Sequence, residues 1–80
     1  MTVAVLLFSS YADALGNDRI TLELPAGASV RDLVDHVRAL PGAERLPASL
    51  LVAVNHEYAM AHHRLAGGDE VALIPPVAGG

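Results

Sequence analysis

Hydrophobic and polar residues follow one another along this chain in patterns that predict strands near both ends and a helix between them. The run Thr2–Ser9 is almost wholly apolar, which predicts a strand buried on both faces near the centre of a sheet. Residues Arg19–Leu24 alternate between polar and apolar with period two, which predicts a half-exposed strand. Between these strands, residues 10–15 end at Gly16, so we expect a short helical turn closed by a glycine.

The clearest helix signal begins at Ser29, a favoured N-cap residue. Asp32 follows three residues later, at the position of the acid in a capping box. The apolar residues that come next are spaced to form one stripe along a helix, and they are Val30, Leu33, Val34, Val37 and Leu40. The pair Pro41-Gly42 predicts the end of this helix, and residues 43–49 are expected to be irregular.

The second half of the chain predicts three more strands. Leu50–Val54 is a short apolar run, residues 58–60 form a possible fourth strand, and Glu70–Ile74 follows the turn signal Gly67-Gly68. The resulting order is strand, strand, helix, strand, short strand, strand. It predicts an α+β protein with the β-grasp fold of ubiquitin, a mixed sheet of about five strands crossed by one main helix. Residues 1–74 are expected to form this domain and residues 75–80 an extended tail.

Composition excludes several kinds of site and partner. The chain has 80 residues, no cysteine and a formal net charge of −4, with all five of its basic residues being arginine. Without cysteine there is no disulfide scaffold, thiolate metal site or cysteine nucleophile. The acidic balance disfavours nucleic acid and anionic membranes. No apolar run is long enough to cross a bilayer and no signal peptide is apparent, so a cytoplasmic location is expected.

Three histidines occur close together in the sequence, at His56, His62 and His63, with Glu57 nearby. A metal site needs two or more imidazoles that converge with a third ligand, and adjacent residues of a strand point to opposite faces. We therefore expect solvated loop histidines and no metal site.

The carboxyl terminus is the most informative segment. Pro75-Pro76 stiffens its base, whereas Gly79-Gly80 has no side chains, so its tip can enter a narrow channel in another protein. This shape suits a chain whose reactive group is the main-chain carboxylate of Gly80. A carboxylate is a poor electrophile, but activation by ATP to an acyl-adenylate supplies a leaving group. A sulfur donor can then convert the acyl-adenylate into a thiocarboxylate.

Several segments together resemble the small subunit of molybdopterin synthase, the ubiquitin-like sulfur carriers of the MoaD family. The resemblance covers the whole chain, and its strongest part is the ending Pro75–Gly80. The other matching segments are the opening strand into Phe8, Tyr11–Gly16, Val52–Asn55 and Leu65–Val71.

The resemblance implies that a ubiquitin-activating-like adenylyltransferase, using ATP and magnesium, adenylates Gly80, and that a sulfur donor protein supplies the sulfur. The tail would then enter the large subunit of molybdopterin synthase and donate sulfur to cyclic pyranopterin monophosphate, for molybdenum cofactor biosynthesis. The family assembles as a heterotetramer. This chain would thus supply the sulfur to an enzyme complex without holding a complete active site or a cofactor of its own.

The resemblance also implies which residues act. Gly80, with Gly79 beside it, would be the reacting end. Apolar side chains on the exposed sheet face and at the tail base would meet the partner proteins, and the candidates are Phe8, Tyr58, Ile74, Pro75, Pro76, Val77 and Ala78. For Phe8 and Ile74, burial in the core is the alternative interpretation.

Other functions remain open at this point. A carrier with the same ending could serve thiamine thiazole or cysteine synthesis, although Pro75-Pro76 favours the molybdopterin branch. The same activation chemistry could instead attach the chain to lysine side chains, as in a ubiquitin-like modifier. A plain interaction module with an incidental tail is the third possibility.

Overall fold

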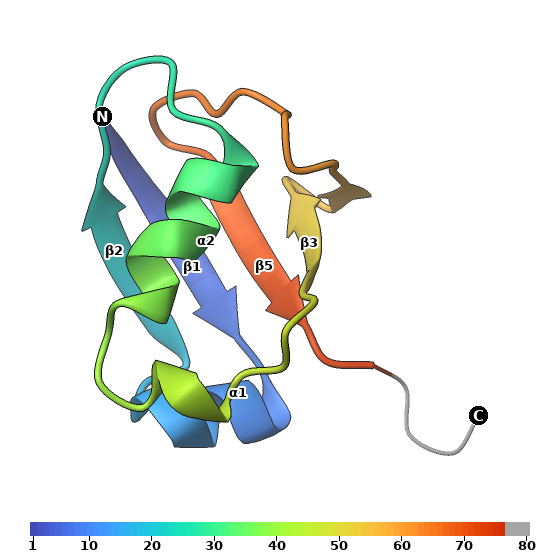
Figure 1. Ribbon diagram of the computed structural model, residues 1–80. Helices are drawn as coiled ribbons and strands as arrows, with labels where there is room; N and C mark the ends of the chain where they lie inside the picture. Colours follow the sequence, from blue (N-terminus) through green and yellow to red (C-terminus); the bar gives the residue numbers. More distant parts are fainter. Residues whose placement is uncertain (77–80) are drawn as a thin grey trace.

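The computed structural model describes residues 1–76 of the chain. A five-stranded mixed sheet is crossed on one face by a helix, so the protein has two layers (Figure 1). The elements in chain order are β1 (Thr2–Leu7), α1 (Ser9–Leu15), β2 (Arg19–Glu23), α2 (Val30–Arg38), the 3-10 turn η1 (Ala43–Arg45), β3 (Leu51–Val54), β4 (Glu57–Tyr58) and β5 (Glu70–Ile74). The predicted β-grasp arrangement is therefore confirmed. In this part of the chain, no helix is long and apolar enough to span a membrane.

The sheet has the strand order β2-β1-β5-β3-β4. The first and last strands, β1 and β5, lie side by side at its centre and run parallel, whereas the other neighbours are antiparallel. A parallel pair needs a crossover between its strands, and the connection that contains α2 places this helix over one sheet face (Figure 1).

The core lies between α2 and the sheet. The sheet contributes every second side chain of its central strands, and those that are buried are Val3, Val5, Leu7, Val52, Val54, Val71 and Leu73. The helix contributes Val30, Leu33 and Val37 from the stripe that the sequence predicted. Burial of each such side chain stabilises the fold by roughly 1.5–3 kcal/mol, so this layer dominates the stability.

The prediction that the first strand is buried on both faces is wrong. Along β1, fully buried residues alternate with Ala4 and Leu6, which are only half-buried, and the strand ends at Leu7. Within residues 1–76, α2 covers one face of the sheet and no helix covers the other, so the second face is left open (Figure 1). The strand is central, as expected, but its second apolar row belongs to a surface.

The ends of the other elements differ from the predictions by a few residues. The helix α2 ends at Arg38, two residues before Leu40, because Pro41 restricts the backbone before it. Within the region expected to be irregular, residues 43–45 form η1. The short fourth strand comprises Glu57 and Tyr58 rather than residues 58–60.

Local signals read from the sequence account for the caps. Gly16 ends α1 in the left-handed conformation, with φ of 76°, as a glycine after a helix does. At the start of α2, Asp32 N–H donates to Ser29 Oγ, and Ser29 N–H donates to Asp32 Oδ2 at 2.9 Å. The predicted capping box is therefore confirmed.

Candidate docking site beside the C-terminal segment

Strand register gathers apolar side chains on the open face of the sheet. Leu6 pairs with Ala72 across β1 and β5, Ala72 pairs with Ala53 across β5 and β3, and Ala53 pairs with Tyr58 across β3 and β4. Directly paired residues of a sheet point to the same face. These four residues therefore form one row, on the face opposite α2.

This row is the centre of a larger surface, which we call the open-face patch and which consists of Leu6, Phe8, Ala53, Tyr58, Ala72 and Ile74. The patch encloses a hollow of about 330 Å³, with His56 and Glu70 at its margin. Two alanines lie between the larger side chains, which explains why the surface is concave. Phe8 is 46% exposed and Tyr58 is 73% exposed. Ala53 is buried at the floor, and the remaining members of the patch are half-buried. An apolar hollow bordered by exposed aromatic rings is typical of protein interaction sites.

The patch reaches the base of the C-terminal segment. Ile74, the last residue of β5, lines the patch and also a second groove of about 330 Å³ that includes Pro76, Leu51 and Tyr11. Pro75 is half-buried and Pro76 is exposed. A protein that covers the patch would therefore also contact the point from which the chain leads toward Gly80.

Charged residues limit the patch on its β1 and β2 side. Arg19 of β2 reaches Glu70 of β5, and their Nη1 and Oε2 atoms are 3.3 Å apart. The Arg19 side chain is 57% exposed and that of Glu70 is 36% exposed, so solvent screens the pair and it contributes little to stability. Beyond it, the exposed side chains of β2 are polar, at Thr21 and Glu23. The open face is thus apolar over β5, β3 and β4 and polar over β2.

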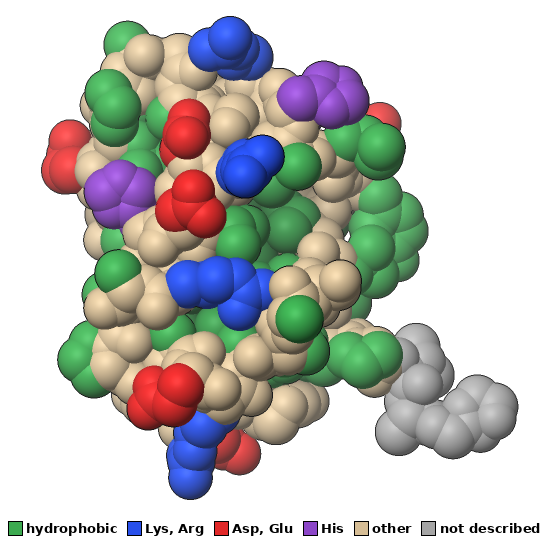
Figure 2. Space-filling view, in the orientation of Figure 1, with side chains coloured by type: hydrophobic (Ala, Val, Ile, Leu, Met, Phe, Trp, Pro, Cys, Tyr) green, Lys and Arg blue, Asp and Glu red, His purple; other side chains and the backbone are tan. Residues whose placement is uncertain are grey.

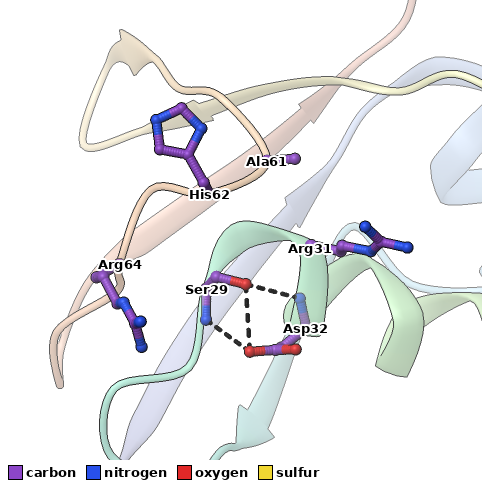
Figure 3. Close-up of a pocket in the computed structure, with 6 residues that line it drawn as sticks. All are labelled: Ser29, Arg31, Asp32, Ala61, His62 and Arg64. Atoms are coloured by element: carbon purple, nitrogen blue, oxygen red, sulfur yellow. Dashed lines mark hydrogen bonds between the residues drawn. The ribbon is translucent and has the colours of Figure 1, made fainter.

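A polar hollow of about 370 Å³ lies at the N-terminus of α2, and Figure 3 shows its lining residues. Its helix N–H groups already have partners. Val30 N–H donates to the His63 carbonyl and Arg31 N–H to the Ala61 carbonyl, both at 2.9 Å, while Asp32 N–H donates to Ser29. Arg64 Nη1 donates to the Gly27 carbonyl. Contacts in the hollow therefore hold residues 61–64 against the helix, and the backbone N–H groups of residues 30–32 are not free to bind an anion.

The Ser29 cap also affects ionisation. The backbone N–H of Ser29, and then its hydroxyl, hold the pKa of Asp32 below its ordinary value, because both hydrogen bonds favour the ionised carboxylate. Among residues 1–76, no group of three or more His, Asp or Glu side chains is placed to hold a metal ion.

The structure brings together several of the residues singled out in the sequence. Phe8, Tyr58 and Ile74 line one hollow, with Pro76 in the adjoining groove. Phe8 is therefore a surface residue. Ile74 is half-buried at the point where the hollow of the open-face patch meets the adjoining groove. Val77, Ala78, Gly79 and Gly80 lie outside the described residues. That these residues bind partners or react remains a prediction.

Sequence reasoning missed three members of the patch, Leu6, Ala53 and Ala72. Leu6 was assigned to a doubly buried strand, and the alanines carry no signal that separates a surface from a core. In β1, Leu6 points to the face opposite Val5 and Leu7. The sequence does not indicate whether a second helix covers that face, so it does not separate a surface position from a core position.

The fold and the apolar surface beside a proline-led C-terminal segment define a ubiquitin-like β-grasp protein. Residues 5–80 match the model of the ThiS family. The molybdopterin synthase sulfur carrier subunit of Chlamydomonas reinhardtii is 35% identical over 100% of both chains. The one from Arabidopsis thaliana is 34% identical over 98% of this chain and 82% of its own length. The chain therefore belongs to the ThiS family and to its group of molybdopterin synthase sulfur carrier subunits, which confirms the resemblance seen in the sequence.

Solved structures agree on the fold. SAMP1 from Haloferax volcanii is 31% identical, covers 100% of both chains and superposes with a TM-score of 0.86. A chain from Helicobacter pylori, solved in a complex of subunits 1 and 2 of molybdopterin-converting factor, covers 100% of both chains with a TM-score of 0.75. The Helicobacter pylori chain is 21% identical to this one, so the comparison supports the fold alone.

Proposed function

We propose that this chain carries sulfur on its C-terminal residue, Gly80. An oxygen of the Gly80 carboxylate attacks the α-phosphorus of ATP, and pyrophosphate leaves. Sulfur from a donor protein, delivered at the oxidation level of hydrosulfide, then attacks the acyl carbon, and AMP leaves to give a thiocarboxylate. ATP and magnesium belong to a ubiquitin-activating-like adenylyltransferase, and this chain binds no cofactor.

The thiocarboxylate is then delivered to the large subunit of molybdopterin synthase. There its sulfur attacks a carbon of cyclic pyranopterin monophosphate, and the carbon–oxygen bond at that carbon breaks so that an oxygen substituent leaves. Water then hydrolyses the acyl–sulfur bond, which leaves the sulfur on the product and restores the Gly80 carboxylate. The product of this reaction carries a dithiolene group. A dithiolene contains two sulfur atoms, so two such transfers complete one product molecule. The chain acts by presenting its terminus, while the partner holds the substrate.

One observation carries this proposal. The open-face patch adjoins Pro76, which begins the segment that ends in Gly79-Gly80. A partner that docks on the patch is thereby placed to receive the terminus, because the four residues after Pro76 span at most roughly 14 Å. Membership of the sulfur carrier group supports the same assignment.

Mass spectrometry tests the first half of the proposal. The chain is incubated with the cognate activating enzyme, ATP, magnesium and sulfide, and the exchange of one oxygen for one sulfur is expected at the C-terminal residue. Deletion of Gly80, or addition of one alanine after it, should abolish the exchange. Both variants should keep the wild-type circular dichroism and unfolding midpoint, since the change lies beyond the last strand. Exchange that persists in either variant would exclude the Gly80 carboxylate as the reacting group.

A second function is favoured by one comparison. SAMP1 of Haloferax volcanii, described as a small archaeal modifier protein, is 31% identical over the whole chain, against 34% and 35% for the two carrier subunits. A modifier would use the same adenylate but transfer the Gly80 acyl group to a lysine amine of a target protein. Immunoblots of cells that express a tagged chain separate the two functions. A ladder of conjugates that depends on Gly80 indicates a modifier, whereas a carrier gives the free chain and restores molybdenum-enzyme activity to a deletion strain.

A further inference from the structure

The strand β3 has an edge that β4 covers only in part. The two residues of β4 pair with Ala53 and Val54. One further bond joins Ala59 N–H to the Val52 carbonyl at 2.9 Å, and the chain then turns away. The N–H and carbonyl of a strand residue point to the same edge, so the Val52 N–H also faces outward from β5. Ala59 lies across from Val52 in this register, but its carbonyl does not accept the Val52 N–H.

An apolar groove of about 280 Å³ runs beside this edge, between β3 and α2. Val34 of α2 forms one wall, and Leu50, Val52 and Ala59 form the other. Figure 2 shows this region from the outside, with hydrophobic side chains (green) recessed between arginine side chains (blue). The groove is thus open to a ligand and is shaped by an element from each layer.

Two arginines of α2 stand over the groove. Arg31, Val34 and Arg38 occupy positions three and four residues apart, so they share one face of the helix. Arg38 is fixed, because its Nη2 donates to the carbonyls of Pro47 at 2.8 Å and Ala48 at 2.9 Å. The Arg31 guanidinium has no hydrogen bond or ion pair with the described residues. In a chain of net charge −4, this is a local cationic rim.

We propose that this groove binds an extended segment of a second protein in which apolar side chains alternate with carboxylates. The segment adds as a strand at the β3 edge, and one of its carbonyls accepts the Val52 N–H. Its apolar side chains enter the groove beside Val34, and its carboxylates reach Arg31 and Arg38. The unpaired N–H specifies an extended backbone, and the two guanidinium groups specify the charge.

This groove is separate from the open-face patch. Val52 and Ala53 are consecutive in β3, so their side chains point to opposite faces of the sheet. Val52 lines the groove on the α2 side, and Ala53 lines the patch. The chain can therefore hold a partner on the patch and the acidic segment in the groove at the same time. The inference does not depend on sulfur transfer, because neither Gly80 nor the patch enters it.

A nuclear magnetic resonance titration of the full chain tests the inference, with a capped peptide of alternating valine and glutamate as the probe. We expect the Val52 amide to shift and to exchange more slowly with solvent on binding. The variant Arg31→Glu should weaken binding about tenfold. Arg45→Glu makes the same change of charge on η1, outside the groove, and should bind as the wild type does. A valine–lysine peptide should not bind.

Three results would overturn the inference. The first is an unchanged Val52 amide at millimolar peptide. The second is equal weakening by Arg31→Glu and Arg45→Glu, which would indicate a general charge effect. The third is a set of shifts centred on Tyr58, which would place the peptide on the patch. Arg31 is exposed, so its variant is expected to fold, and its amide spectrum without peptide verifies this.

Discussion

Tyr58 lies directly across from Ala53 in the β3–β4 pair, and this register carries its exposed ring onto the open face of the sheet. Ala53 is too small to cover the ring, so Tyr58 borders a hollow whose floor is formed by Ala53 and Ala72. An aromatic ring at the rim of an apolar hollow offers a large contact area to a partner.

The first prediction concerns this ring. Under the proposed function, Tyr58→Ala should weaken binding to the proposed activating enzyme and to the proposed large-subunit partner by about tenfold or more, because a large aromatic contact is lost. The unfolding free energy should change by less than about 0.5 kcal/mol, since the side chain is 73% exposed. Met60→Ala is the control, because Met60 is 69% exposed but lies outside the patch. Equal effects of the two variants on affinity, measured by calorimetry, would exclude the patch as the docking surface.

The second prediction concerns the packing of the loop after α2 against α1. A Cβ atom at Gly42 would lie 1.9 Å from the carbonyl oxygen of Ala14, and Gly42 has φ of 92°. Gly42→Ala should therefore lower the unfolding free energy by about 3 kcal/mol or more, through a clash together with backbone strain.

Gly16→Ala is the matched control. Gly16 also has a positive φ, of 76°, but a Cβ there would meet nothing within 4 Å. Its cost should be only about 1 kcal/mol, from strain alone. Urea unfolding of both variants measures the difference. Similar losses in the two would show that the approach to Ala14 is not what constrains position 42.

The third prediction follows from the low pKa of Asp32. A carboxyl group whose pKa is lower in the folded than in the unfolded chain stabilises the fold above its ordinary pKa of 3.8. That contribution is lost as the pH falls through the lower folded value. Stability should therefore drop on acidification below about pH 4, and Asp32→Asn should reduce this drop.

Urea midpoints measured between about pH 5 and pH 2 check this prediction. Asp35→Asn removes a carboxylate from the same helix that receives no hydrogen bond from the described residues. It is the charge-matched control for Asp32→Asn. An unchanged slope in Asp32→Asn would show that the capping box does not set the acid sensitivity.

The fourth prediction concerns Tyr11, which is only 4% exposed. Its hydroxyl is buried and has no hydrogen-bond partner among residues 1–76. A desolvated hydroxyl without a partner destabilises the fold, so Tyr11→Phe should leave stability unchanged or raise it by about 1 kcal/mol. Tyr58→Phe, at an exposed position, is the control. A loss of stability in Tyr11→Phe would reveal a partner for this hydroxyl in the intact chain.

Much of the fold could be predicted from local signals. The period-two alternation of residues 19–24, the capping pair Ser29 and Asp32, and Gly16 after α1 each act within a few residues, so the sequence carries them directly. The order of these elements then leaves few topologies, because a parallel pair requires a crossover. The predicted ends of α2 and β4 differ from the observed ends by one or two residues, because tertiary packing decides where each element stops.

The candidate site was predictable at its ends and not at its centre. Phe8, Tyr58 and Ile74 stand out as large apolar residues near strand ends, whereas Ala53 and Ala72 do not. No local signal says that Leu6 and Ala72 are neighbours, because 65 residues separate them and only strand pairing brings them together.

By itself, then, the sequence determined the elements, their caps, the β-grasp order and the diglycine ending, because each depends on residue type and spacing along the chain. The tertiary structure alone decided which apolar residues form a core and which form a surface. A single helix can cover only one face of the sheet, so the second apolar row of β1 remains at the surface (Figure 1). The partly covered edge at Val52 has the same origin, since it depends on where β4 leaves β3.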